Sequence, residues 1–211
     1  MKTEQYNAQN KVWPKEGSHI LAQFDDQTIK VYQAYKPSIG NFAVENGYFG
    51  GDYSFNRMSW IKPNFLWMMY RCGWASKLGQ EVVLAITIPR PLFDEFLESA
   101  VASSFSQSTF ESRQEWKDAL AVSEVRLQWD PDHSPTGQKL DRRAIQLGLR
   151  GGALERFARD EVIQIDNVTE FVKEQSKFAY QTDFQGLETP KELIYTPKSE
   201  RARLNIKLDP L

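Results

Sequence analysis

The chain of 211 residues contains a single cysteine, Cys72, and only two histidines, His19 and His133. One cysteine excludes an internal disulfide and a zinc site built from several thiolates. Neither histidine lies in a recognisable motif, so we expect both in exposed loops and expect no bound metal. Cys72 lies in an apolar stretch, which predicts a buried, unreactive thiol rather than a nucleophile.

Long apolar runs and a strong net charge are also missing. No segment has the length and continuous apolarity of a membrane span, and the polar residues 1–10 lack the apolar core of a signal peptide. We therefore expect a cytoplasmic protein that does not bind membranes. The formal net charge of −2 gives no global field that would recruit nucleic acid.

The common sequence signatures of nucleotide binding and hydrolysis are absent. The chain has no Gly-x-x-x-x-Gly-Lys-Ser/Thr loop, no Gly-x-Gly-x-x-Gly turn after a strand, and no Gly-x-Ser-x-Gly elbow. These absences argue against a P-loop NTPase, a dinucleotide-binding Rossmann fold and an α/β-hydrolase.

The densest stretch of large side chains is residues 56–74, which contains three tryptophans, three methionines, two arginines and one lysine. Pro63 suits the first position of a helix, because its missing N–H has no partner there. Residues 65–70 are all large and apolar or aromatic, which is typical of a buried helix. The charged residues beside them must find an acceptor in the protein or on a ligand.

The order of the predicted elements indicates a single α+β domain. Residues 28–35 alternate as a half-buried strand, residues 37–46 form a helix that Gly47 closes, and residues 82–88 suit a strand buried on both faces. Helices and strands then follow without regular alternation, so we expect a split or strongly bent mixed sheet with packed helices. We expect a flexible segment at 1–17, the globular domain at 18–195 and a tail at 196–211.

Polar residues placed beside aromatic residues are the best candidates for a binding site. Arginine and lysine can hold phosphate, and aromatic rings can stack on a base or a pyridinium. Alternatively, Arg57 and Arg71 pair with acids such as Asp25, Asp26 or Asp130 and only hold the fold. The candidate ligand-binding residues are Tyr32, Tyr35, Arg57, Ser59, Trp60, Lys62 and Arg71.

Four motifs closely resemble an uncharacterised bacterial and fungal family classed as a domain of unknown function. They are Tyr-Gln-Ala-Tyr at 32–35, the stretch 57–74, Gln-Trp-Asp-Pro at 128–131 and residues 145–151. The resemblance covers residues 19 to 195 and implies no particular activity.

A second resemblance is to the ADP-ribosyltransferases. Residues 31–35, the following helix and the exit Gly47-Tyr48-Phe49 look like the opening of that fold, where a strand ending in Tyr-His-Gly-Thr precedes a helix. The resemblance implies that Ser59 and Trp60 hold the nicotinamide ribose and ring, and that Gln33 replaces the family's histidine. The strand near 124–132 would carry the catalytic position, which Glu124, Gln128 or Asp130 could fill.

This second resemblance implies an NAD-binding protein that transfers ADP-ribose to a protein or nucleic-acid acceptor. Arg57 or Lys62 would hold the pyrophosphate, and Gln33 with Gln128 or Asp130 would act in catalysis. Two alternatives stay open: a non-catalytic module that binds a nucleotide or single-stranded nucleic acid, and a purely structural protein. The acceptor and the oligomeric state are left open as well.

Overall fold

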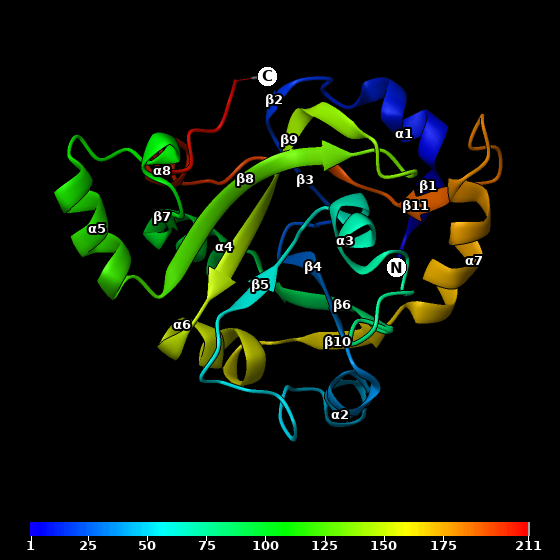
Figure 1. The fold of residues 1–211 in the computed structure, drawn as a ribbon, viewed down its shortest axis with the longest axis horizontal. Helices are drawn as coiled ribbons and strands as arrows, with labels where there is room; N and C mark the ends of the chain where they lie inside the picture. Colours follow the sequence, from blue (N-terminus) through cyan, green and yellow to red (C-terminus); the bar gives the residue numbers. More distant parts are fainter. Residues whose placement is uncertain (211) are drawn as a thin grey trace.

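The computed structural model describes residues 1–210, and strands of different lengths occur along the whole of this range (Figure 1). The strands are β1 (Thr3–Gln5), β2 (Gly17–Ser18), β3 (Ile20–Ala22), β4 (Thr28–Tyr35), β5 (Ser59–Ile61), β6 (Val82–Pro89), β7 (Val101–Ala102), β8 (Val125–His133), β9 (Lys139–Leu149), β10 (Gln164–Asn167), β11 (Glu188–Pro190) and β12 (Leu193–Tyr195).

Helices are interspersed among these strands, as expected for an α+β domain. They are α1 (Tyr6–Val12), α2 (Pro37–Asn46), α3 (Phe65–Cys72), α4 (Arg90–Ser99), the 3-10 turn η1 (Phe105–Gln107), α5 (Arg113–Val122), α6 (Gly151–Glu155), the π-helical turn η2 (Arg156–Asp160), α7 (Thr169–Ala179) and α8 (Glu200–Asn205). The predicted α+β class is therefore confirmed.

Two sheets meet at one point. In the first, β4 and β10 flank β6, and all pairs are antiparallel. In the second, β9 pairs with β8 on one side and with β5 and β2 on the other, and β7 extends it beyond β8. A bridge between Tyr32 and Lys62 joins β4 to β5, with N···O distances of 2.7 and 3.3 Å. The combined sheet is mixed and splits beside this bridge. Figure 1 shows β5 between the strands of the two sheets.

Strand β6 is the centre of the first sheet, as its apolar run predicted. Leu84, Ile86 and Ile88 face one apolar cluster, whereas Val83 and Ala85 face another. A strand with an apolar cluster on each face needs apolar residues at every position, which explains the run.

Helix α3 is nearly surrounded by protein, and its ends follow local capping rules. Asn64 is the N-cap and its side chain accepts a hydrogen bond from the backbone of Trp67 at 2.6 Å. Gly73 ends the helix in the left-handed conformation with φ of 59°. The helix therefore begins at Phe65 rather than at Pro63, and only Tyr70 and Arg71 are exposed.

Residues 1–17, expected to be a flexible segment, instead form β1 and α1 and pack on the domain. β1 pairs with β11, and Tyr6 and Trp13 are buried. The indole N–H of Trp13 donates to the carbonyl of Glu192 at 3.0 Å. The segments that β1 and α1 pack against lie near the other end of the sequence, so no local sequence pattern predicts this packing.

The expected tail at 196–211 also contributes to the core within the described residues. Ala202 and Ile206 are fully buried, and α8 packs on α4. Trp129 donates its indole N–H to the carbonyl of Ile206 at 2.8 Å.

The connection between β8 and β9 is short. β8 continues to His133 and β9 starts at Lys139, with an irregular register between Pro131 and His133. The extended antiparallel pair tolerates Pro131 at this irregularity, because proline is accepted in strands at bulges and edges.

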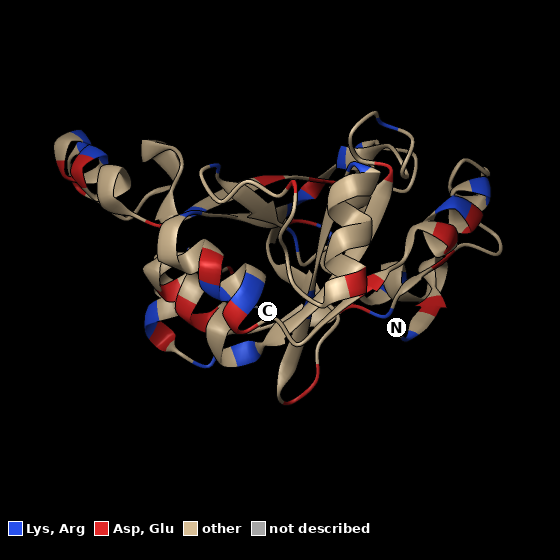
Figure 2. Cartoon of the chain, turned by 90° about the horizontal axis from the view of Figure 1, so that it is seen from below, with Lys and Arg blue, Asp and Glu red and all other residues tan. Residues whose placement is uncertain are grey.

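Charged residues of both signs are interspersed on the helices at either end of the molecule (Figure 2). This distribution agrees with the small net charge. Among the described residues, no helix is long and apolar enough to cross a bilayer.

Candidate functional site

A cleft of about 750 Å³ lies where the two sheets meet, and both β4–β5 and β8–β9 contribute to its walls. Its volume is within the range of ligand-binding pockets. Nine of the eleven candidate residues named from the sequence line this cleft: Gln33, Tyr35, Arg57, Ser59, Trp60, Lys62, Arg71, Gln128 and Asp130. Residues separated by almost 100 positions are thus brought to one place.

Glu124 lies outside the cleft, where its carboxylate accepts the backbone N–H groups of Gly152 and Ala153, each at 3.0 Å. Tyr32 also lies outside the cleft. Its side chain is fully buried in the apolar cluster around α3, where its ring packs edge-on against Phe65 at 5.5 Å. Successive side chains of a strand point to opposite faces, so Tyr32 and Gln33 cannot both face the cleft. The prediction that Tyr32 contacts a ligand is corrected accordingly.

The floor of the cleft is a hydrogen-bonded group at the junction of the sheets. Gln33 Nε2 donates to Ser59 Oγ at 2.8 Å and to the Trp60 carbonyl at 3.1 Å. Ser59 Oγ also lies 2.7 Å from the hydroxyl of Tyr35. Since the Trp60 carbonyl can only accept, the group of Gln33 that faces it must be the NH₂.

This orientation leaves the other end of the Gln33 amide unused. Gln33 is 2% exposed, and its Oε1 is buried with no hydrogen-bond partner among the described residues. A buried acceptor without a partner costs free energy, and such atoms in native structures call for an explanation.

Two tyrosines adjoin this group. The rings of Tyr35 and Tyr53 are 5.7 Å apart, and both residues line the cleft. Burial raises the pKa of both phenols above the ordinary value of 10.0. Both hydroxyls therefore stay protonated at neutral pH and are available as hydrogen-bond donors.

Trp60 lies on β5, which pairs with β9 in antiparallel orientation, and is directly opposite Gly148. A Cβ at Gly148 would lie 2.6 Å from Met58 Sδ and 3.0 Å from Trp60 Cε2, so a larger residue there would have to displace these two side chains. The indole of Trp60 is half-buried and lines the cleft, which leaves part of the ring available to a ligand.

Lys62 is the buried cation of the cleft and is 6% exposed. Its ammonium group donates to the Trp60 carbonyl at 3.3 Å, and no carboxylate pairs with it in the described part of the chain. Burial lowers the pKa of Lys62 to about 7, with a further lowering by Arg71 that Asp130 partly offsets. At neutral pH a large fraction of this amine is uncharged.

Asp130 faces the cleft with its carboxylate held by two amides. Gln128 Nε2 donates to Oδ1 at 2.8 Å and Gln146 Nε2 donates to Oδ2 at 2.7 Å. Gln128 and Gln146 are directly opposite each other in the β8–β9 pair. Gln146 was not among the predicted site residues, although it lies within the motif at 145–151 and alternates with the buried residues of its strand.

Arg57 and Arg71 do not form the ion pairs expected if they served only to hold the fold. Both are exposed, and within residues 1–210 neither guanidinium pairs with Asp25, Asp26, Asp130 or another acid. Two guanidinium groups at the cleft are therefore free to bind an anion.

Trp67 of α3 lines the cleft and belongs to a group of three stacked rings. Tyr70 and His133 stack with centroids 3.6 Å apart, and Trp67 and His133 with centroids 5.1 Å apart. His133 is 2% exposed and His19 is 7% exposed, so the expectation of exposed loop histidines is wrong for both. Burial lowers the pKa of His133, which favours the neutral ring.

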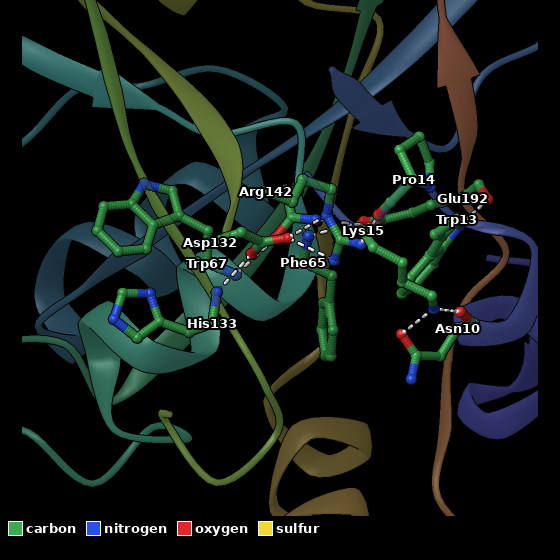
Figure 3. A network of polar contacts seen from close by, with 11 residues as sticks. Asn10, Trp13, Pro14, Lys15, Phe65, Trp67, Asp132, His133, Arg142 and Glu192 are labelled. Atoms are coloured by element: carbon green, nitrogen blue, oxygen red, sulfur yellow. Dashed lines mark hydrogen bonds and ion pairs between the residues drawn. The ribbon is translucent and has the colours of Figure 1, made fainter. Parts of the chain in front are cut away.

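Behind the cleft, a buried polar network fixes the position of β8, β9 and α3 (Figure 3). Arg142 contacts Asp132 Oδ2 at 2.6 Å through Nη2 and at 2.8 Å through Nε, and donates to the Pro14 carbonyl at 2.6 Å. Glu192 Oε1 accepts the backbone N–H of Phe65 at 2.7 Å at the start of α3. Burial raises the pKa of Glu192 to about 8.

No group of three or more His, Cys, Asp or Glu side chains able to hold a metal ion occurs within residues 1–210. Cys72 is fully buried, and burial raises the pKa of its thiol, as predicted for an unreactive cysteine.

Comparison with known families adds one assignment. A family model described as Domain of unknown function (DUF4291) matches residues 19–195. The chain belongs to this family. The match contains all the elements that line the cleft, from β4 to β9, and the family description states no activity. No curated protein matches the chain.

Proposed function

We propose that the protein binds NAD in the cleft and transfers its ADP-ribose to a protein or nucleic-acid acceptor. The observation that carries the proposal is the joint placement of Gln33, Ser59 and Asp130 on one cleft. These residues come from the first, second and last strands on which the resemblance to ADP-ribosyltransferases rests. The sheet splits beside these residues, as expected from the order of the predicted elements.

The unused acceptor of Gln33 suits the carboxamide of nicotinamide, whose N–H groups can donate to Oε1. Trp60 would contact the ring, and a cation–π contribution is available as long as the pyridinium is charged. The neutral hydroxyls of Tyr35 and Tyr53 would donate to the ribose. The two guanidinium groups of Arg57 and Arg71 would hold the pyrophosphate.

Cleavage of the nicotinamide–ribose bond leaves the bonding electron pair on the nicotinamide nitrogen and develops positive charge at the ribose carbon. A carboxylate already oriented by two amides, as Asp130 is, stabilises such charge without reorganisation. The acceptor then bonds to the ribose carbon and releases a proton, with the cleft supplying proximity and orientation.

The direct test is release of nicotinamide from NAD, together with mass-spectrometric detection of ADP-ribose on the protein itself or on an added protein or oligonucleotide. Asp130→Asn should lower the rate by about 100-fold or more, in the range found for lost electrostatic stabilisation. Asp141→Asn, an exposed change on the same strand pair, is the matched control. Equal rates in the two variants would remove Asp130 from the mechanism.

A second candidate is a non-catalytic module that binds a nucleotide or single-stranded nucleic acid. The unpaired guanidinium groups of Arg57 and Arg71 beside Trp60 favour it, because phosphate contacts and base stacking are the elements of such binding. Salt-dependent binding of an oligonucleotide without any turnover of NAD would support this candidate instead.

A further inference from the structure

Lys62 is unusual among the charged residues of the cleft because it is enclosed by protein and still has no counter-ion. It is 6% exposed and its ammonium group contacts only the Trp60 carbonyl, at 3.3 Å. A buried structural lysine would be expected to pair with a carboxylate. Lys30 shows that usual case, since it lies 3.6 Å from Asp166 and 2.7 Å from Thr87 Oγ1.

The charged neighbours of Lys62 come from α3 and β8. Arg71 on α3 disfavours the protonated amine, whereas Asp130 on β8 and the thiol of Cys72 favour it to a smaller extent. With burial as the largest effect, the result is an amine that is substantially neutral at pH 7. A neutral lysine amine inside a cleft is the form that attacks carbonyl carbons.

The same cleft supplies a way to hold the ligand that carries the carbonyl. Arg57 and Arg71 line it and are unpaired in the part of the chain that the structure describes, so they suit a phosphate group. Two cations beside a buried nucleophile favour a small molecule that has both an anionic group and a carbonyl.

We propose that Lys62 is a nucleophilic amine that forms an imine with the aldehyde of a phosphorylated ligand, such as the open-chain form of a sugar phosphate. The amine nitrogen bonds to the aldehyde carbon to give a carbinolamine. Loss of one water molecule then gives the imine, so the step needs no oxidant or reductant. Imine formation requires only the Lys62 amine and the aldehyde, so it does not rest on the proposed binding of NAD.

The test uses pyridoxal 5′-phosphate, an aromatic aldehyde with a phosphate group, as the probe on the full chain. After brief exposure at pH 7, sodium borohydride reduces any imine, and peptide mass spectrometry identifies the labelled lysines. An amine with a pKa of about 7 is about half neutral at that pH. An ordinary lysine is less than about 0.1% neutral. Lys62 should therefore be labelled more than about tenfold faster than Lys30.

Two controls separate reactivity from accessibility. Pyridoxal without the phosphate should label Lys62 more slowly, because Arg57 and Arg71 no longer contribute. Lys62→Arg should abolish the dominant label, whereas Lys30→Arg should leave it intact. The mapping of the wild-type protein needs no variant, so it decides the matter even if a variant fails to fold.

The pH dependence of Lys62 labelling distinguishes a nucleophilic amine from a lysine with a purely structural role. Removing the positive neighbour in Arg71→Gln should move the midpoint of Lys62 labelling to higher pH, and Asp130→Asn should move it to lower pH. Labelling spread over exposed lysines, or a labelling midpoint of Lys62 near that of an ordinary lysine, would overturn the proposal.

Discussion

Gln33 on β4 donates a hydrogen bond to Ser59 on β5 at 2.8 Å, across the point where the two sheets part. This contact connects the strands at the floor of the cleft together with the bond of Gln33 to the Trp60 carbonyl, the contact between Tyr35 and Ser59, and the backbone bridge between Tyr32 and Lys62. The hydrogen bond between Gln33 and Ser59 therefore connects the two sheets and also stabilises the floor of the cleft.

Ser59→Ala should weaken the fold measurably, because it removes an acceptor for Gln33 and a partner for the hydroxyl of Tyr35. We expect the free energy of unfolding to fall by about 1–2 kcal/mol, measured by urea denaturation. Ser54→Ala, an exposed change in the same cleft, should cost less than about 0.5 kcal/mol. Equal losses in the two variants would show that the junction does not depend on Ser59.

We expect the stability of the fold to depend strongly on both partners of the buried ion pair between Asp132 and Arg142. Arg142→Met leaves Asp132, which is 1% exposed, without its counter-ion. Such a change should lower the free energy of unfolding by about 3–5 kcal/mol, and Asp132→Leu combined with Arg142→Met should be less destabilised than the single variant.

The exposed pair of Lys36 and Asp52 provides the control for that experiment. Its side chains are half-exposed, so Lys36→Met should change the free energy of unfolding by less than about 1 kcal/mol. A loss of unfolding free energy as large as that of Arg142→Met would mean that burial does not explain the large effect of breaking the Asp132–Arg142 pair.

Glu192 predicts a pH dependence of stability with a definite sign. Burial raises its pKa in the folded state to about 8, above the ordinary value of 4.5. Between these values the folded state binds more protons than the unfolded state, so this group lowers the free energy of unfolding as pH rises. The slope is at most about 1.4 kcal/mol per pH unit.

Glu192→Gln should remove this contribution, because glutamine does not titrate. Unfolding free energies of wild type and variant should therefore differ progressively between pH 5 and pH 8, with the wild type losing stability relative to the variant as pH rises. A constant difference over that range would contradict the raised pKa.

Much of the fold was predictable because it follows local rules. The run at 82–88 identified β6, Gly47 identified the end of α2, and the apolar residues before Arg71 identified α3. Each signal is contained in a window of about ten residues. The placement of residues 1–17 was not predictable in this way, because Tyr6 and Trp13 pack on segments from the opposite end of the chain.

The site was only partly predictable for the same reason. The alternation along β4 distinguishes Gln33 from Tyr32, but which face forms the cleft depends on how the second sheet joins the first. Gln146 is recognisable only once β8 and β9 pair and place it opposite Gln128. The burial of His133 depends on α3, which supplies Trp67 and Tyr70, and both of these rings stack with the imidazole.

Thermal unfolding with and without millimolar NAD tests the central claim most directly, on wild type, Ser59→Ala, Arg57→Ala and the control Ser54→Ala. Ligand at about 100 times its dissociation constant adds roughly 2.7 kcal/mol, which raises the melting temperature by a few degrees. We predict this shift in wild type and Ser54→Ala, and its loss in the other two relative to their own ligand-free values. No shift in the wild type at any NAD concentration would contradict the account.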